Sequence, residues 1–182
     1  MKKQSKVWTI PNLLSFFRLA LIPFIVWAYF LNVPYLCAGL IVLSAITDLL
    51  DGYIARHFDM VSALGKALDP IADKLTLLAI IICVGIKKPM LFLLAGVFAI
   101  KEIIMGIQGL IIIKKTGTTY SAKWYGKMAT AIMYVSMLIL IVWAAIPNYL
   151  MHVILWLCVG VVLFSLIMYT IRNFKCLKRQ VG

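Results

Sequence analysis

The chain has 182 residues, of which 64% are hydrophobic and only 13% are charged. A soluble domain is closer to half apolar and a quarter charged, so this composition excludes an ordinary soluble globule and a disordered chain. The net charge of +12 is typical of basic residues that flank membrane spans, and no soluble basic face is available for nucleic acid. We therefore expect an integral, multi-pass membrane protein without a nucleic-acid partner.

Six stretches are long and apolar enough to cross a hydrocarbon core of about 30 Å as helices. They are residues 11–31, 35–56, 66–86, 89–113, 121–146 and 149–171. Because several connections are short, neighbours in sequence are expected to pack antiparallel. With no repeat and no second domain visible, the sequence predicts an all-α bundle of six transmembrane helices, forming a single membrane domain over residues 1–182.

The basic residues are distributed unevenly over the connections between these spans. Thirteen of them fall in the N-terminus, the second-to-third and fourth-to-fifth connections and the C-terminal tail, against two on the other side, Lys87 and Lys88. Basic connections remain in the cytoplasm. Both termini are therefore predicted to be cytoplasmic.

Four of the six acidic residues form two pairs in one short window: Asp48 with Asp51, and Asp69 with Asp73. The spacings i,i+3 and i,i+4 each put two side chains on one helix face. The second and third spans form a hairpin, which brings the pairs together at the cytoplasmic membrane boundary. Four adjacent carboxylates cannot stay ionised there without cations. An all-oxygen cluster suits Mg²⁺ or Mn²⁺ better than zinc.

Residues 48–56 read DLLDGYIAR and residues 65–73 read GKALDPIAD, with eight residues between them. This matches the pattern DxxDGxxAR-x8-GxxxDxxxD, so the chain resembles the CDP-alcohol phosphotransferase family. Residues 9–18, TIPNLLSFFR, are similar to the start of the phosphatidylglycerophosphate and cardiolipin synthases in that family, and the chain most resembles the former. Family members are six-span membrane enzymes, which agrees with the predicted spans.

The resemblance implies that an alcohol hydroxyl attacks the β-phosphorus of CDP-diacylglycerol and that CMP leaves. It implies that Asp48, Asp51 and Asp69 bind two divalent cations, Mg²⁺ or Mn²⁺. Two such ions neutralise a diphosphate and can activate the attacking oxygen. The resemblance makes Asp73 the general base, which also contacts a metal. The active site is then cytoplasmic.

The donor site follows from the same resemblance. Small residues leave room for the nucleotide, and Arg56 can bind a phosphate as a bidentate donor. The small residues are Gly52, Ala55 and Gly65. Asn12 and Arg18 are implied to lie beside the nucleotide; the alternative is a helix start with an arginine that reaches the membrane surface.

The acceptor is the variable part of the family. Glycerol-3-phosphate requires an anion site, for which the candidates are Lys101, deep in the fourth span, and Lys123 and Lys127, at i,i+4 on one face of the fifth. Alternatively, Lys101 pairs with Glu102. The segment Ala63 to Pro70 also resembles cardiolipin synthases, whose acceptor, phosphatidylglycerol, has no phosphate monoester.

Two further classes of function remain open from the sequence. An acidic cluster in a membrane can mark an ion path, so a divalent-cation transporter is one alternative. A non-catalytic scaffold is another, although all four aspartates of the pattern are present. Contact with membrane lipids is expected in each case, and the family resemblance makes a homodimer possible.

Overall fold

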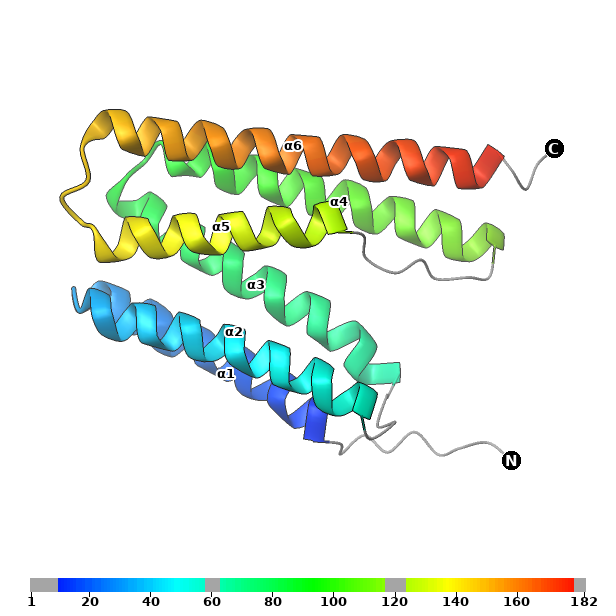
Figure 1. The fold of residues 1–182 in the computed structure, drawn as a ribbon, viewed down its shortest axis with the longest axis horizontal. Coiled ribbons are helices and arrows are strands. Elements are labelled where there is room, and N and C mark those ends of the chain that lie inside the picture. The colour runs from blue at the N-terminus through cyan, green and yellow to red at the C-terminus, as the bar shows by residue number, and fades with distance from the viewer. Residues whose placement is uncertain (1–9, 58–62, 117–123, 179–182) are drawn as a thin grey trace. The chain divides into compact units, whose positions relative to one another are not determined.

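In the computed structural model, residues 10–57, 63–116 and 124–178 are described, with the side chains of residues 12–48, 50, 71–114 and 124–174. These residues form six helices (Figure 1): α1 (Ile10–Phe30), α2 (Pro34–His57), α3 (Ala63–Lys87), α4 (Leu91–Thr116), α5 (Trp124–Val142) and α6 (Asn148–Lys178). The described part of the chain contains no strand. The all-α prediction is therefore confirmed.

Four of the six helices are long and apolar enough to cross a membrane. Within the described residues these are Asn12–Phe30 in α1, Leu91–Lys114 in α4, Trp124–Val142 in α5 and Asn148–Phe174 in α6. In α2 the apolar segment is shorter, Pro34–Asp48, because the carboxylates begin at its end. The helices fit a membrane helical bundle, and the crossing of the membrane by α2 and α3 stays a prediction.

A tight turn joins α1 to α2. Asn32 has a φ of 57°, the left-handed conformation that Asn tolerates better than most residues. The amide of Asn32 donates to the carbonyl of Tyr29, and the amide of Val33 donates to the carbonyl of Ala28. These bonds provide hydrogen-bond donors for carbonyl groups in the last turn of α1. Pro34 then occupies the first position of α2, where its missing amide hydrogen costs nothing. The two helices pack side by side as an antiparallel hairpin (Figure 1).

The fifth and sixth helices differ from their predicted bounds. The fifth stretch was expected to continue to residue 146, but α5 ends at Val142, and the turn before Pro147 includes a bond from the Ile146 amide to the Trp143 carbonyl. Composition could not detect this, since Trp143 to Ile146 is as apolar as the helix. In contrast, α6 continues to Lys178, seven residues beyond the predicted 171. The prediction ended where the apolar run ends, but a helix can continue through basic and polar residues outside the hydrocarbon core.

The chain divides into two compact units, residues 1–83 and 84–182. The first contains the α1–α2 hairpin and most of α3, with Ile25, Ala28 and Ile41 in its core. In the second, α6 packs against both α4 and α5, with Leu94, Met137 and Leu155 buried. Large apolar side chains such as Trp27, Ile103 and Trp156 remain exposed. On a soluble protein, exposed apolar side chains occur singly and do not extend along whole helices. An apolar surface of this extent is typical of a protein surrounded by lipid.

Candidate active site

The buried face of α1 changes from polar to apolar along the helix. Asn12, Ser15 and Arg18 are each no more than 1% exposed, and the same face continues through Leu21 and Ile25. An arginine is rarely buried without partners. The start of α1 therefore belongs to a polar interior, and the snorkelling alternative for Arg18 is wrong, since that side chain does not reach the surface.

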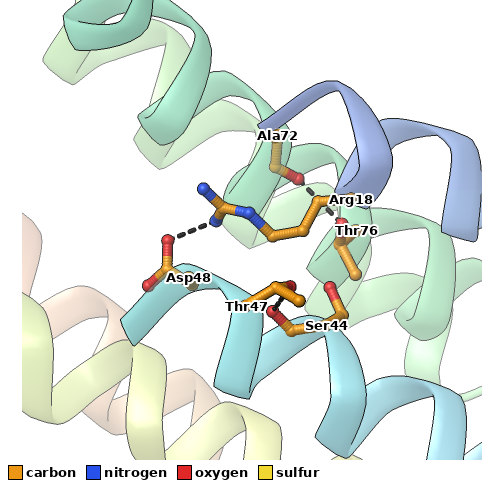
Figure 2. Close-up of polar contacts among 6 residues, drawn as sticks. All are labelled: Arg18, Ser44, Thr47, Asp48, Ala72 and Thr76. Atoms are coloured by element: carbon orange, nitrogen blue, oxygen red, sulfur yellow. Dashed lines mark hydrogen bonds and ion pairs between the residues drawn. The ribbon is translucent and has the colours of Figure 1, made fainter. Parts of the chain in front are cut away.

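Arg18 forms an ion pair with the first aspartate of the family pattern. Its Nη1 donates to Oδ1 of Asp48 on α2, and Figure 2 shows the two side chains pointing toward one another. The hairpin register explains this contact. Arg18 lies 12 residues before Phe30 and Asp48 lies 14 residues after Pro34, so both are about 20 Å from the turn.

Two hydroxyl groups near this ion pair are satisfied within their own helices. Thr47 Oγ1 donates to the Ser44 carbonyl at 2.7 Å, and Thr76 Oγ1 donates to the Ala72 carbonyl at 2.8 Å (Figure 2). Such bonds to the preceding turn let a hydroxyl be buried without a partner on another helix. Polar side chains from α2 and α3 thus continue the polar interior that begins on α1.

Asp73 lies on α3, next to Ala72, and is partly buried. Asp48 is nine residues before the end of α2, and Asp73 is ten residues after the start of α3. Both carboxylates are therefore about 15 Å along their helices from the connection between them. That connection has five residues, 58–62, so the facing helix ends are within about 20 Å of each other. The hairpin expected for the acidic pairs is compatible with this placement.

The other predicted residues of this region are described only through their backbone, which is helical. Asp51, Gly52, Ala55 and Arg56 belong to α2, while Gly65 and Asp69 belong to α3. Their side chains lie outside the described residues. Among those that are described, no group of three His, Cys, Asp or Glu side chains could hold a metal ion. Asp48 and Asp73 offer the carboxylate oxygens that Mg²⁺ and Mn²⁺ prefer, and Asp48 is 43% exposed, so the described donors fit a hard cation.

Lys101 and Glu102 form a buried ion pair within α4. Lys101 Nζ contacts Glu102 Oε1, and the two side chains are 9% and 15% exposed. The ring of Phe98 lies 5.6 Å from the same ammonium group. Lys101 is ten residues into α4, about 15 Å along the helix, so this charge is deep in a candidate span. The pairing alternative is therefore present, and acceptor binding by Lys101 stays a prediction.

The two lysines expected on the fifth helix differ in what the structure describes. Lys127 is exposed on α5. Lys123 lies outside the described residues. Both, like Lys101, belong to the second compact unit, whereas the aspartates belong to the first. Acceptor binding by these lysines remains a prediction.

A polar network between α4 and α6 was not predicted from the sequence. Gln108 Nε2 donates to Thr170 Oγ1 at 3.0 Å, and Asn173 Nδ2 donates to Gln108 Oε1 at 2.9 Å. Asn173 Oδ1 in turn accepts from Nη2 of Arg172 at 3.1 Å. The available signal was the presence of an amide in each of two apolar helices, because polar groups between membrane helices tend to bond across them.

A pair of tyrosine rings packs between α5 and α6. The rings of Tyr125 and Tyr169 meet edge to face at 4.6 Å between centroids. The guanidinium of Arg172 lies 4.9 Å from the centroid of the Tyr169 ring. A Cβ atom on Gly126 would be 2.4 Å from the Tyr169 hydroxyl oxygen. Glycine at position 126 is therefore what permits this close approach.

These features define an all-α integral membrane protein with a polar interior and a carboxylate from each of two consecutive helices. A sequence model of the CDP-alcohol phosphatidyltransferase family matches residues 8–167. The chain belongs to this family. The match includes α1, both acidic pairs and most of α6.

Similar proteins include glycerol-3-phosphate phosphatidyltransferases and cardiolipin synthases. The chain is 44% identical over 100 residues to a CDP-diacylglycerol–glycerol-3-phosphate 3-phosphatidyltransferase of Rickettsia bellii, covering 50% of this chain and 55% of that protein. It is 46% identical over 69 residues to a human CMP-forming cardiolipin synthase, covering 37% and 23%. It is 35% identical over 102 residues to a cardiolipin synthase/mitochondrial hydrolase fusion protein of Schizosaccharomyces pombe, covering 56% and 17%. The aligned part thus spans about half or less of each relative.

Proposed function

We propose that this protein transfers a phosphatidyl group from CDP-diacylglycerol to an alcohol, releasing CMP, and that the alcohol is glycerol-3-phosphate. The observation that carries the proposal is the position of Asp48 and Asp73, the first and last aspartates of the pattern, at matched distances from the α2–α3 connection. The family match over residues 8–167 includes both. Relatives named for this reaction support the acceptor.

The aspartates divide the work of binding and proton transfer in this proposal. Asp48, Asp51 and Asp69 would hold two divalent cations, Mg²⁺ or Mn²⁺, and Asp73 would also contact a metal. Bound there, the cations neutralise the diphosphate and the charge that develops on it. Arg56 contacts a donor phosphate, and Gly52, Ala55 and Gly65 leave space for the nucleotide. Asn12 lies beside the nucleotide at the polar start of α1.

Asp73 acts as the general base. Its carboxylate takes the proton of the acceptor hydroxyl while the oxygen of that hydroxyl bonds to the β-phosphorus. The bond from the β-phosphorus to the bridging oxygen breaks, and this oxygen leaves as part of CMP. Asp73 is only partly buried, so its proton can pass to water after each turnover. Lys101, Lys123 and Lys127 bind the phosphate of the acceptor.

Phosphatidylglycerol is the second candidate acceptor. The Lys101–Glu102 ion pair favours it, because a lysine already neutralised by a carboxylate attracts a phosphate monoester less strongly. Relatives named cardiolipin synthase also support it. In either case the site and both termini are proposed to be cytoplasmic, since most basic residues fall on that side. A homodimer is proposed from the family resemblance alone.

The test is CMP release by the purified protein in detergent with CDP-diacylglycerol and Mg²⁺ or Mn²⁺. Glycerol-3-phosphate, phosphatidylglycerol, inositol, inositol phosphate and serine are offered separately. Release with glycerol-3-phosphate alone supports the proposal, whereas release with phosphatidylglycerol alone transfers it to cardiolipin synthesis. No metal-dependent release with any acceptor contradicts the donor assignment, and cation flux into vesicles is then the measurement that separates a transporter from a scaffold.

Two matched variants test the role of the aspartates. Asp73→Asn removes the proposed base and is expected to lower kcat at least 100-fold, the lower range of what a general base contributes. Asp59→Asn makes the same chemical change at an acidic residue outside the pattern and is expected to keep activity. Equal activity of the two variants would contradict the assignment of Asp73.

A further inference from the structure

The Arg18–Asp48 ion pair places a fixed positive charge on a proposed metal ligand. Arg18 is 1% exposed, whereas the Asp48 side chain is 43% exposed. The pair therefore has one partner inside the unit and one that is partly exposed. A cation arriving from solvent meets a carboxylate whose inner oxygen, Oδ1, is already bonded to a guanidinium.

We propose that Arg18 is an internal counter-cation of Asp48: it lowers the affinity of the empty site for divalent cations, so that they bind tightly only together with the donor diphosphate. This inference rests on the proposed function, because Asp48 is a metal ligand only in that proposal. Arg18 is then a positioning residue that acts through Asp48, in place of the nucleotide contact that the family resemblance implies for it.

Charge balance supports this role. The four aspartates carry four negative charges, and Arg18 and Arg56 carry two positive charges. Two divalent cations alone would leave this set with an excess of two positive charges, which the two negative charges of a diphosphate cancel. Cations and donor should therefore favour each other's binding, and such coupling is reciprocal.

Two effects of Arg18 on a cation oppose each other. The guanidinium orients the carboxylate, which helps a ligand, and it repels a divalent ion that shares the same carboxylate. Ordering one aspartate side chain is a small effect, whereas repulsion between a double and a single charge a few ångströms apart is large in a partly buried site. Repulsion is therefore the stronger of the two, and loss of the arginine should tighten cation binding.

The first measurement is Mn²⁺ binding to the purified full-length protein in detergent without substrate, from the electron paramagnetic resonance signal of free Mn²⁺. Arg18→Gln removes the charge and is expected to lower the Mn²⁺ Kd by on the order of tenfold. Arg18→Lys keeps the charge and is expected to bind Mn²⁺ as the unmodified protein does. A Kd for Arg18→Gln that is unchanged or higher overturns the proposal.

The second measurement repeats the titration with CDP-diacylglycerol present and no acceptor, corrected by a protein-free sample. In the unmodified protein the donor is expected to tighten Mn²⁺ binding by on the order of tenfold, and in Arg18→Gln this gain should be smaller. A donor KM that rises at saturating Mn²⁺, with the Mn²⁺ Kd unchanged, would show that Arg18 contacts the nucleotide instead.

A control variant separates this effect from loss of stability. Ile25 is buried on the same face of α1, two turns beyond Arg18. The substitution Ile25→Ala leaves a cavity at this position. It is expected to lower the melting temperature without changing the Mn²⁺ Kd. If the unmodified protein binds no Mn²⁺ with or without donor, the metal assignment of the proposed function fails. If it binds Mn²⁺ and Arg18→Gln binds equally, only the counter-cation role fails.

Discussion

Replacing one or both members of the Lys101–Glu102 pair tests whether this buried charge serves structure or acceptor binding. Both side chains are mostly buried, 9% and 15% exposed, in the middle of an apolar helix. Removing one partner of a buried ion pair costs about 3–5 kcal/mol, because the other charge is left uncompensated. Because the Glu102 side chain is still 15% exposed, we expect the lower end, about 3 kcal/mol, for Lys101→Met.

The double variant Lys101→Met/Glu102→Gln removes both charges and is expected to be within about 1 kcal/mol of the unmodified protein. The assay is unfolding in mixed detergent and dodecyl sulfate micelles, from which the free energy of unfolding is extrapolated. Lys127→Met makes the same change at an exposed lysine of α5 and should cost no more than about 0.5 kcal/mol. The reasoning is refuted if Lys101→Met costs less than about 1 kcal/mol, or if the double variant is as unstable as the single changes added together.

The same variants separate the two roles of Lys101. If Lys101 binds the phosphate of the acceptor, the double variant regains stability and keeps a raised KM for glycerol-3-phosphate. If Lys101 only neutralises Glu102, the double variant has both the stability and the KM for glycerol-3-phosphate of the unmodified protein. Measuring both quantities on one preparation distinguishes these outcomes.

Three further substitutions test packing in the second unit. Gly126→Ala puts a Cβ about 1 Å too close to the Tyr169 hydroxyl, since ordinary contact begins at 3.4 Å and the distance is 2.4 Å; overpacking should cost about 1–3 kcal/mol of unfolding free energy. Gly160→Ala has nothing within 4 Å and should gain up to about 1 kcal/mol from helix propensity, so equal effects of the two would contradict the packing. Ser165, fully buried, has a hydroxyl oxygen with no hydrogen-bond partner in the described part of the chain; Ser165→Ala should be neutral or stabilising by about 1 kcal/mol, and a loss in thermal unfolding would reveal a partner.

Local sequence patterns were sufficient for the helices and for the acidic motif. A helix that crosses hydrocarbon must bond all of its backbone groups internally, so apolar length alone predicted six helices at nearly the observed positions. The spacing of Asp48 and Asp51, and of Asp69 and Asp73, depends only on helix periodicity. The end of α5 was misplaced because Trp143 to Ile146 is apolar although its backbone turns.

Contacts between helices required the tertiary structure. The sequence indicated Arg18 and Asp48 as site residues but not as partners, because they are 30 residues apart and meet only through the register of the α1–α2 hairpin. It left open whether Lys101 pairs with Glu102, since neighbouring residues on a helix need not face each other. Likewise, Gly126 could be read only as a small residue until the buried Tyr169 ring was found against it. Composition and spacing determine where a helix forms, whereas the rotation of one helix against another is decided by side-chain packing between segments distant in sequence, and this packing brought Arg18 to Asp48.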